Sequence, residues 1–382
     1  FLSARLTEGV PLAFLGDVPV EGGLLEKLHL RQLSEPAKSV KITAFDSSLI
    51  GHFEAPLKSR TRGLQPLQLA DPSLGTPLLS LTDNLNRTLI PMAIMPWGGM
   101  ALSPYLLEEG ASQRRWIVDP VAFLQRALRL PVMPRIDATT ENGRRIATVH
   151  IDGDGFASKA EIAGSPFSGE VVLEKFIKPH DYLTSVSVIE GEIGAKGMYP
   201  ALTSTLEPLA RRIFADVKVE PATHTFSHPF YWQDSQSDDV ESMYGQHMAI
   251  PNYPKIDLAR EIIGSRDYMQ NRLLPAGKKV ELIFWSGEAL PGADAIDMAY
   301  KAGMANVNGA NTFITRANPS LTGLYPLLRP TEGGLQIYAP MINENVYTNL
   351  WNGPFYGFER VVDTFELTES PRRLRALSLY YH

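Results

Sequence analysis

Cysteine is absent from the 382-residue sequence. That absence excludes disulfide bonds, thiolate metal ligands and cysteine nucleophiles, although it does not decide between a reducing and an oxidising compartment. Runs of lysine or arginine are also absent, and the formal net charge is −6. Because nucleic-acid binding needs concentrated positive charge, the sequence indicates no nucleic-acid partner. No apolar stretch approaches the roughly 18 residues that cross a bilayer, so we expect no membrane span.

The composition is that of an ordinary globular protein, with 44% hydrophobic and 20% charged residues. Its length of 382 residues favours about two domains. A polar stretch that carries Pro131 and Pro134 separates residues 1–140 from residues 141–382, and we place the domain boundary there. The sequence begins with Phe1 and shows no signal peptide, so we expect it to be a fragment of a longer protein.

Residues 1–140 contain four short apolar runs, each bounded by proline, aspartate or glycine, at 10–15, 40–45, 77–81 and 88–95. Residues 116–128 have apolar positions at helical spacing. This pattern predicts a smaller mixed α/β region, similar to part of an amidotransferase-like or flavodoxin-like layer. No paired nucleophile and base stands out in it, so we assign it no catalytic residue.

Residues 141–382 alternate between short apolar runs and stretches with helical spacing. We expect strands at 146–151, 182–189, 217–219, 279–285, 304–308, 335–341 and 375–381. Strands that alternate with helices over short connections form a parallel sheet with outer helices. The sequence therefore predicts an α/β fold, a distorted and incomplete (β/α) barrel of about seven parallel strands.

Two of these strands end in residues that suit a metal ion. The run 146–151 ends in Asp152-Gly-Asp154-Gly, and the short strand at 217–219 leads to His224 and His228. On one helical turn, residues at i and i+4 lie on the same face, so both imidazoles can point at one ion. Two histidines and one aspartate form a set of three protein ligands, as in catalytic zinc sites that keep a position open for water.

Each half of this pattern also has a common structural explanation. Aspartates at i and i+2 occur in turns, and histidines at i and i+4 occur in cores and on surfaces. A glycoside hydrolase that uses Asp152 and Asp154 is a further alternative. Two aspartates on one strand end lie too close together for that chemistry, which separates its carboxyl groups by about 5 Å or more. It would also give the histidine pair no role.

The motifs Asp152-Gly-Asp154-Gly and His224-Thr-Phe-Ser-His228-Pro resemble the first two motifs of the polysaccharide deacetylase superfamily. The sequences at 224–232 (HTFSHPFYW), 285–292 (WSGEALPG) and 379–382 (LYYH) are most similar to the deacetylase region of the Pel exopolysaccharide deacetylases of Gram-negative bacteria. The resemblance is good over residues 140–382 and loose over residues 1–140. It implies the distorted barrel that the strand pattern also predicts.

The resemblance implies a role for each chemical group. Asp152 is then the general base, Asp154, His224 and His228 bind a divalent metal, most simply Zn²⁺, and His382 is the general acid. In the family the two aspartates are adjacent, whereas Gly153 separates them here, which leaves open which of them is the base. The family's Arg-x-Pro motif, which orients the aspartate, is also missing, so either Arg266 or Arg316 replaces its arginine or the aspartate is held differently.

Five further residues are candidates for contact with sugar. They are Tyr231, Trp232, Trp285, Glu288 and Asn308. Flat aromatic faces suit sugar rings, but core packing explains the aromatic residues equally well, and Glu288 also suits a helix start. We assign structural roles to the remaining histidines, including His150, which lies on the opposite face of its strand from Val149 and Ile151.

The function implied by the resemblance is metal-dependent N-deacetylation of an N-acetylhexosamine exopolysaccharide, with release of acetate. The implied setting is the periplasm, with an outer-membrane export protein that carries helical repeats as partner. A non-catalytic polysaccharide-binding module with a relic metal site is the main alternative. The ligand set also suits cobalt, nickel or iron, and the sequence does not distinguish a galacto- from a gluco-configured sugar.

Overall fold

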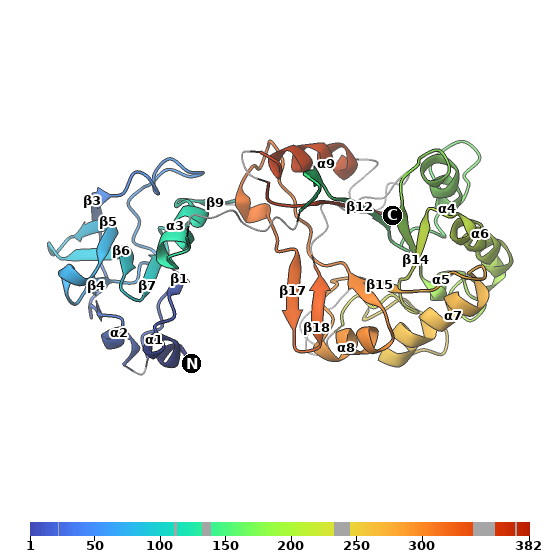
Figure 1. The fold of residues 1–382 in the computed structure, drawn as a ribbon, viewed down its shortest axis with the longest axis horizontal. Helices are drawn as coiled ribbons and strands as arrows, with labels where there is room; N and C mark the ends of the chain where they lie inside the picture. Colours follow the sequence, from blue (N-terminus) through green and yellow to red (C-terminus); the bar gives the residue numbers. More distant parts are fainter. Residues whose placement is uncertain (22, 111–112, 132–138, 233–244, 339–355, 371–372) are drawn as a thin grey trace. The chain divides into compact units, whose positions relative to one another are not determined.

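A computed structural model of the chain describes residues 1–21, 23–110, 113–131, 139–232, 245–338, 356–370 and 373–382. The chain divides into two compact units, Phe1–Ile136 with Ser320–Thr322 and Asp137–Pro319 with Gly323–His382 (Figure 1). The segment 320–322 joins the first unit through the Glu54 carboxylate, which accepts hydrogen bonds from Leu321 N (2.7 Å) and Ser320 Oγ (2.6 Å). A boundary at residue 140 does not anticipate this returning segment.

The first unit is built on a five-stranded sheet with strand order β1-β7-β6-β5-β3. Its elements are α1 (Leu2–Thr7), β1 (Leu12–Gly16), α2 (Leu24–Lys27), β2 (Leu30–Gln32), β3 (Val40–Phe45), β4 (Leu67–Leu69), β5 (Thr76–Asp83), β6 (Thr88–Met95), β7 (Gly98–Leu102), β8 (Leu107–Glu109), β9 (Arg114–Trp116) and α3 (Pro120–Ala127). Strands β2 and β4 form one separate antiparallel pair, and β8 and β9 form another.

Strand direction in this unit corrects one expectation. Among the described strands of its five-stranded sheet, only the β1–β7 pair is parallel, whereas β3–β5, β5–β6 and β6–β7 are antiparallel. A flavodoxin-like layer pairs its strands in parallel around intervening helices. Here residues 84–87 join β5 to β6, and residues 96–97 join β6 to β7. Connections this short permit only antiparallel partners, because parallel neighbours need a crossover of a dozen or more residues.

The second unit carries an eight-stranded sheet with strand order β17-β18-β16-β15-β14-β13-β12-β19. Its elements are β10 (Thr140–Glu141), β11 (Arg144–Arg145), β12 (Ala147–Ile151), α4 (Ser168–Val171), β13 (Thr184–Val188), α5 (Glu190–Ile193), α6 (Thr203–Ala215), β14 (Val219–Thr223), α7 (Ser265–Arg272), β15 (Leu282–Phe284), α8 (Ala293–Lys301), β16 (Ala305–Val307), β17 (Leu328–Thr331), β18 (Gly334–Ile337), α9 (Tyr356–Leu367) and β19 (Leu377–Tyr381). Every pair in the sheet is parallel except β17–β18.

The sheet of the second unit curls into an incomplete barrel, and helices α6, α7 and α8 lie on its outer side (Figure 1). Apolar side chains of strands and helices fill the core between them, as Val186, Leu206 and Ile283 illustrate with exposed fractions of 2%, 0% and 0%. Burying a side chain of this size contributes about 1.5–3 kcal/mol to folding. The mixed α/β class and the mostly parallel, incomplete barrel agree with the prediction from the strand pattern.

Strands β14 and β17 illustrate how the sheet differs from the sequence-based expectation. Strand β14 begins at Val219 and continues to Thr223, beyond the expected 217–219, because Ala222 and Thr223 pair with Leu282 and Ile283 of β15. Strand β17 was not expected, since a short edge strand with little apolar alternation gives a weak signal. The expected strand at 335–341 starts within β18, and its end lies outside the described residues.

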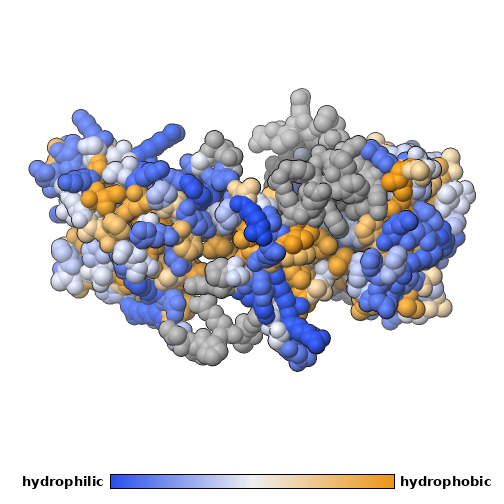
Figure 2. Space-filling view, turned by 90° about the horizontal axis from the view of Figure 1, so that it is seen from above, coloured by the Kyte–Doolittle hydropathy of each residue, from blue (hydrophilic) through white to orange (hydrophobic). Residues whose placement is uncertain are grey.

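The surface of both units is mixed rather than uniformly apolar. On the face shown in Figure 2, hydrophilic residues are distributed over both units and stand among hydrophobic ones. Among the described residues, no helix combines the length and the apolar character that crossing a bilayer requires.

Candidate metal centre

The candidate site lies where parallel strands of the second unit end. Asp152 and Asp154 follow β12, His224 follows β14 directly, and His382 follows β19 directly. The carboxyl ends of parallel strands meet at one edge of a sheet, which is where sites in α/β folds are built. Because β19 pairs with β12 in register, Ile151 lies opposite Tyr381, and Asp152 N donates to Tyr381 O at 2.9 Å. The last strand therefore brings His382 beside the aspartates.

The histidine pair lies on an irregular loop and not on the helical turn that the i, i+4 spacing suggested. Residues 224–228 have no helical hydrogen bonding, and Thr225 and His228 adopt positive φ angles of 71° and 51°. Such angles are unfavourable for residues other than glycine, so surrounding contacts must hold the loop. His228 N donates to Thr225 Oγ1 at 3.1 Å, which closes the loop on itself.

A buried carboxylate that the sequence did not reveal holds this loop. Glu261, on the π-helical segment Arg260–Gly264, is fully buried. It accepts hydrogen bonds from the backbone N–H groups of Phe226 and Ser227, both at 2.9 Å, and from Ser227 Oγ at 2.5 Å. Charge-assisted hydrogen bonds are stronger than neutral ones, so Glu261 fixes the loop that carries both histidines.

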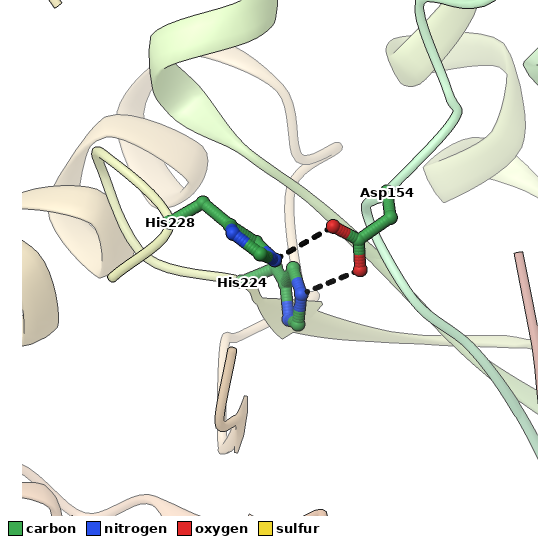
Figure 3. A group of neighbouring side chains, drawn as sticks. All are labelled: Asp154, His224 and His228. Carbon is green, nitrogen blue, oxygen red and sulfur yellow. Dashed lines mark hydrogen bonds and ion pairs between the residues drawn. The ribbon is translucent and has the colours of Figure 1, made fainter. Parts of the chain in front are cut away.

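Three predicted ligands converge on one point (Figure 3). His224 Nε2 lies 3.1 Å from Asp154 Oδ2, and His228 Nε2 lies 2.6 Å from Asp154 Oδ1. Their ligand atoms all lie within 4.8 Å of one another, and all three residues are buried. This Asp/His cluster has the donor set, the convergence and the burial that a metal ion needs.

The hydrogen bonding of His224 also suits a metal ligand. Its Nδ1 lies 3.0 Å from the carbonyl oxygen of Phe284 and must donate to it, because a carbonyl only accepts. A neutral His224 then presents the lone pair of Nε2 towards Asp154. This arrangement of a metal-ligating histidine, with its other nitrogen bonded to a backbone carbonyl, is common in metal sites. Two facing acceptors need a proton or a cation between them.

The pKa values of Asp154 and His224 also indicate a place for a cation. Burial by itself raises the pKa of Asp154, but His228 and His224 outweigh it and hold that pKa well below its usual value. Burial likewise lowers the pKa of His224, and Asp152 and Asp154 overcome it and raise the pKa to about 9. The site therefore retains positive charge beside Asp154, a place that a divalent cation can take by displacing protons.

Asp152 has different surroundings from Asp154. Its Oδ2 accepts a hydrogen bond from Asn308 Nδ2 at 2.8 Å, and its Oδ1 has no hydrogen-bond partner among the described residues. Burial, with a smaller contribution from Asp154, raises the pKa of Asp152 to about 7, although His224 opposes it. Asp154 is thus the carboxylate that contacts both histidines, whereas Asp152 contacts Asn308.

His382 belongs to the same cluster. Its Nε2 lies 3.7 Å from Asp154 Oδ2, and its side chain is buried. Ligand atoms of His382, Asp152 and Asp154 lie within 4.8 Å of one another. Burial lowers the pKa of His382 to about 4, against the opposing effect of Asp154, so the imidazole is neutral at pH 7 in the metal-free protein.

The structure corrects several of the expected sugar contacts. Trp285 is only 1% exposed and donates from Nε1 to Asn306 Oδ1 at 2.9 Å, so it is a core residue. Trp232 packs edge-on against it and donates to Ser286 O. Glu288 accepts from Trp232 N at 2.9 Å, and burial raises its pKa. The side chains of Trp232, Trp285 and Glu288 are thus used for packing and hydrogen bonding within the second unit. Tyr231 is half-buried and remains a candidate for contact with sugar.

Asn308 is also placed differently from the expectation that it contacts sugar hydroxyls. It is buried and its amide faces Asp152. Neither arginine proposed to hold that aspartate reaches it. Arg266 bonds with Asp267 and the carbonyl of Ala302, and Arg316 pairs with Asp363 and Glu366. Within the described part of the chain, Asp152 is therefore held by Asn308 and not by an arginine.

Three residues near the site were not predicted from the sequence, namely His150, Glu192 and Glu261. For His150 a signal was available, because residues at i and i+2 share one face of a strand and His150 therefore lies on the face of Asp152. His150 Nε2 lies 4.0 Å from Asp152 Oδ1 and 2.8 Å from Asn308 Oδ1. Glu192 lies on the four-residue helix α5 and Glu261 on the π-helical segment Arg260–Gly264, and no motif in these short stretches marks either glutamate as a site residue.

The buried carboxyl group of Glu192 has a raised pKa, which makes the stability of the protein depend on pH. Its Oε2 is buried without a hydrogen-bond partner among the described residues. Burial and Asp154 together raise its pKa to about 8, whereas an unfolded glutamate titrates near 4.3. A raised carboxyl pKa means that the folded protein binds a proton that the unfolded chain has lost, so stability falls as pH rises from about 4.3 to 8.

We expect Glu192→Gln to remove that decline in the metal-free protein. At pH 7.5 the variant should melt roughly 10 °C above wild type, because about three pH units separate that pH from the unfolded pKa, one unit corresponds to about 1.4 kcal/mol, and each kcal/mol corresponds to roughly 2–4 °C. At pH 4 the two proteins should melt together. Thermal unfolding monitored by circular dichroism measures both, with the exposed Glu281→Gln as control. Equal melting temperatures at pH 7.5 would contradict the assignment.

Comparisons with known proteins add little to this geometry. No protein-family model matches the chain, and no curated protein matches it. Among solved structures, the chain is similar to the 4-alpha-glucanotransferase from Thermococcus litoralis, with 12% sequence identity and a TM-score of 0.34. The match covers 62% of this chain and 32% of that chain, so it spans about a third of the enzyme's length. A likeness this distant carries no argument about activity.

Proposed function

We propose that the second unit is a metal-dependent deacetylase that removes acetyl groups from an N-acetylhexosamine polysaccharide. The observation that carries the proposal is the buried cluster of Asp154, His224 and His228 with a second, differently held carboxylate, Asp152, beside it. Two nearby carboxylates in different surroundings are typical of sites that use one as ligand and the other as base. Zn²⁺ suits the two nitrogens and one oxygen best.

Amide hydrolysis needs an activated water, stabilisation of the negative charge that develops on the carbonyl oxygen, and a proton for the departing amine. When bound, a divalent metal ion supplies the first two, because it lowers the pKa of a water and polarises a carbonyl. Asp154, His224 and His228 would hold that ion. The protein's own acid and base must supply the rest.

Asp152 and His382 perform the proton transfers in this proposal. Asp152 accepts the proton of the attacking water through Oδ1, the oxygen that has no hydrogen-bond partner among the described residues. His382 delivers a proton to the departing amine. Because its low pKa leaves it neutral at rest, His382 must gain that proton during turnover. In this proposal Asp152, whose carboxylate lies within 4.8 Å of the His382 ring nitrogen, passes the proton to it through one intervening water.

The same distances argue against the two-carboxylate glycoside hydrolase. Retaining enzymes separate their carboxyl groups by about 5–5.5 Å, and inverting enzymes separate them further. Oxygens of Asp152 and Asp154 lie within 4.8 Å of each other, and Asp154 is engaged by both histidines. Asp154 is therefore not free to act as a nucleophile or an acid.

The resemblance to the Pel exopolysaccharide deacetylases supports the choice of polymer, an N-acetylated hexosamine chain that gains free amines. It also supports a periplasmic setting and an outer-membrane export protein with helical repeats as partner. These parts of the proposal rest on the motifs at 152–155, 224–229 and 285–292 and not on the geometry of the site.

Acetate release tests the proposed function. Purified protein should release acetate from N-acetylgalactosamine or N-acetylglucosamine oligomers at neutral pH. A chelator should abolish the release, and added Zn²⁺ should restore it, since the proposed chemistry depends on the ion. An enzymatic acetate assay measures the release, and a reducing-sugar assay on the same samples detects glycosidic cleavage. Bound metal without acetate would instead indicate a non-catalytic binding module, and new reducing ends would indicate a glycoside hydrolase.

A further inference from the structure

Asn308, at the end of β16, is the polar group that contacts Asp152 most closely among the described residues. Its Nδ2 donates to Asp152 Oδ2 at 2.8 Å and to the carbonyl oxygen of Trp285 at 3.1 Å. Both partners only accept hydrogen bonds when Asp152 is charged, so they determine which way the amide points. Both protons of the amide are then used, and its oxygen faces the opposite direction.

His150 occupies that opposite direction. Its Nε2 lies 2.8 Å from Asn308 Oδ1. Burial lowers the pKa of His150 to about 4, so the imidazole is neutral and must carry its proton on Nε2 to donate to Asn308. The ring stacks on Tyr380 with centroids 5.1 Å apart and an interplanar angle of 8°, and it lies 4.8 Å from the ring of Phe284. These contacts leave His150 little freedom to move.

The backbone of Asn308 is held as firmly as its side chain. It has a φ angle of 91°, which only glycine and, less readily, asparagine or aspartate adopt without a large penalty. Gln336, fully buried on β18, donates from Nε2 to the carbonyl oxygens of Asn308 (2.6 Å) and Ala289 (2.7 Å). Arg329 Nη1 in turn donates to Gln336 Oε1 at 2.8 Å. Gln336 and, behind it, Arg329 thus hold this strained backbone position.

We infer that Asn308, backed by His150, is the positioning residue for Asp152. By binding Oδ2, the amide orients the carboxylate and leaves Oδ1 to accept a proton. The inference rests on the proposed function for the meaning of that proton transfer, but the geometric claim about Asp152 stands independently. A misplacement of about 1 Å in a catalytic group can lower a rate about 100-fold, so this network is expected to affect turnover strongly.

Crystal structures of wild type and Asn308→Gly test the geometric claim. Glycine accepts the φ of 91° without strain and removes the amide, so the backbone should stay in place. Asp152 should keep its orientation in wild type and rotate about its side-chain torsions in the variant. The nearly isosteric Asn308→Asp, which places an acceptor where a donor is needed, should also displace Asp152. An unchanged Asp152 in both variants would overturn the inference, whatever the activity.

Steady-state kinetics with a matched control variant test whether the Asn308 amide affects turnover. Asn306→Ala is the control, because Asn306 is an equally buried asparagine two residues earlier that bonds to Trp285 Nε1 and Leu335 O and makes no hydrogen bond to Asp152. Asn308→Gly should lower kcat about 100-fold with little change in KM or in metal content. Asn306→Ala should keep kcat within a few-fold of wild type, even if its melting temperature falls as far as that of Asn308→Gly.

The two histidine variants separate positioning from general loss of stability. His150→Gln retains an N–H donor for Asn308 Oδ1, whereas His150→Leu removes it. We expect His150→Gln to restore most of the kcat that His150→Leu loses. If Asn308→Gly and Asn306→Ala lower kcat equally, the positioning role is refuted. If wild type itself releases no acetate, the proposed function fails, and the crystal structures still decide the role of Asn308.

Discussion

His224→Ala is expected to lose the bound metal and acetate release together. In the proposed site His224 supplies one of the three ligand atoms. The nearby His382 imidazole, 3.7 Å from Asp154 Oδ2, is assigned to proton transfer in this proposal and not to the metal. Loss of an outer partner of a metal ligand costs roughly 10- to 100-fold in metal affinity or activity. Loss of the ligand itself should cost more. The metal content of His224→Ala, measured by elemental analysis after dialysis, should fall from one equivalent towards none.

A control is needed because His224 is also a buried side chain. The exposed His180 lies in the same unit, and its ring stacks only on Tyr182 among the described residues. His180→Ala should therefore retain both metal and activity. Circular dichroism of the His224 variant checks that it folds, and His224→Gln, which fills more of the same volume, is used if the alanine variant does not. Full metal content in a folded variant would show that the ligand set is wrong.

Asp152→Asn is expected to keep the metal and lose turnover. The substitution preserves shape, and the asparagine oxygen can still accept from Asn308 Nδ2. It removes the group that accepts the proton of water, and general bases typically contribute 10²- to 10⁴-fold to a rate. We therefore expect kcat to fall by about that factor with one equivalent of metal retained. Steady-state acetate release and elemental analysis on the same preparation measure the two quantities.

This variant also decides between the two aspartates. If Asp152→Asn loses the metal while Asp154→Asn keeps it, the roles of ligand and base are reversed from those proposed. Asp181→Asn, which alters an exposed carboxylate of the same unit, should change neither quantity. Retention of full kcat by Asp152→Asn would exclude Asp152 as the base and leave Asp154 and His382 to carry the chemistry.

Much of the second unit could be predicted because its signals are local. The apolar run before Asp152 and the strand-like run before His382 are readable in short windows, and both fall on strands of the central sheet. The spacing of Leu206, Leu209 and Ile213 likewise predicts the buried face of α6. A buried strand or an amphipathic helix leaves its period in the sequence, whereas the short edge strand β17 leaves almost none.

The irregular parts of the site could not be predicted in the same way. The spacing of His224 and His228 suggested a helical turn, but the Glu261 carboxylate holds them on a loop with two strained residues. Likewise, Trp285 in the sequence is an aromatic residue next to a strand end, and only its packing shows that it is buried. Strained backbone and burial depend on contacts from distant segments, so no short window contains them.

The sequence by itself determined the α/β class of the second unit and the placement of Asp152, Asp154 and both histidines after strands, because strand periodicity is a local property. Only the tertiary structure decided which of these groups meet. Asn308 lies 156 residues from Asp152 and 158 from His150, and the three are brought together by the order of strands in the sheet. That order is set by packing of the whole barrel, since hydrogen bonds between neighbouring strands look alike wherever they form.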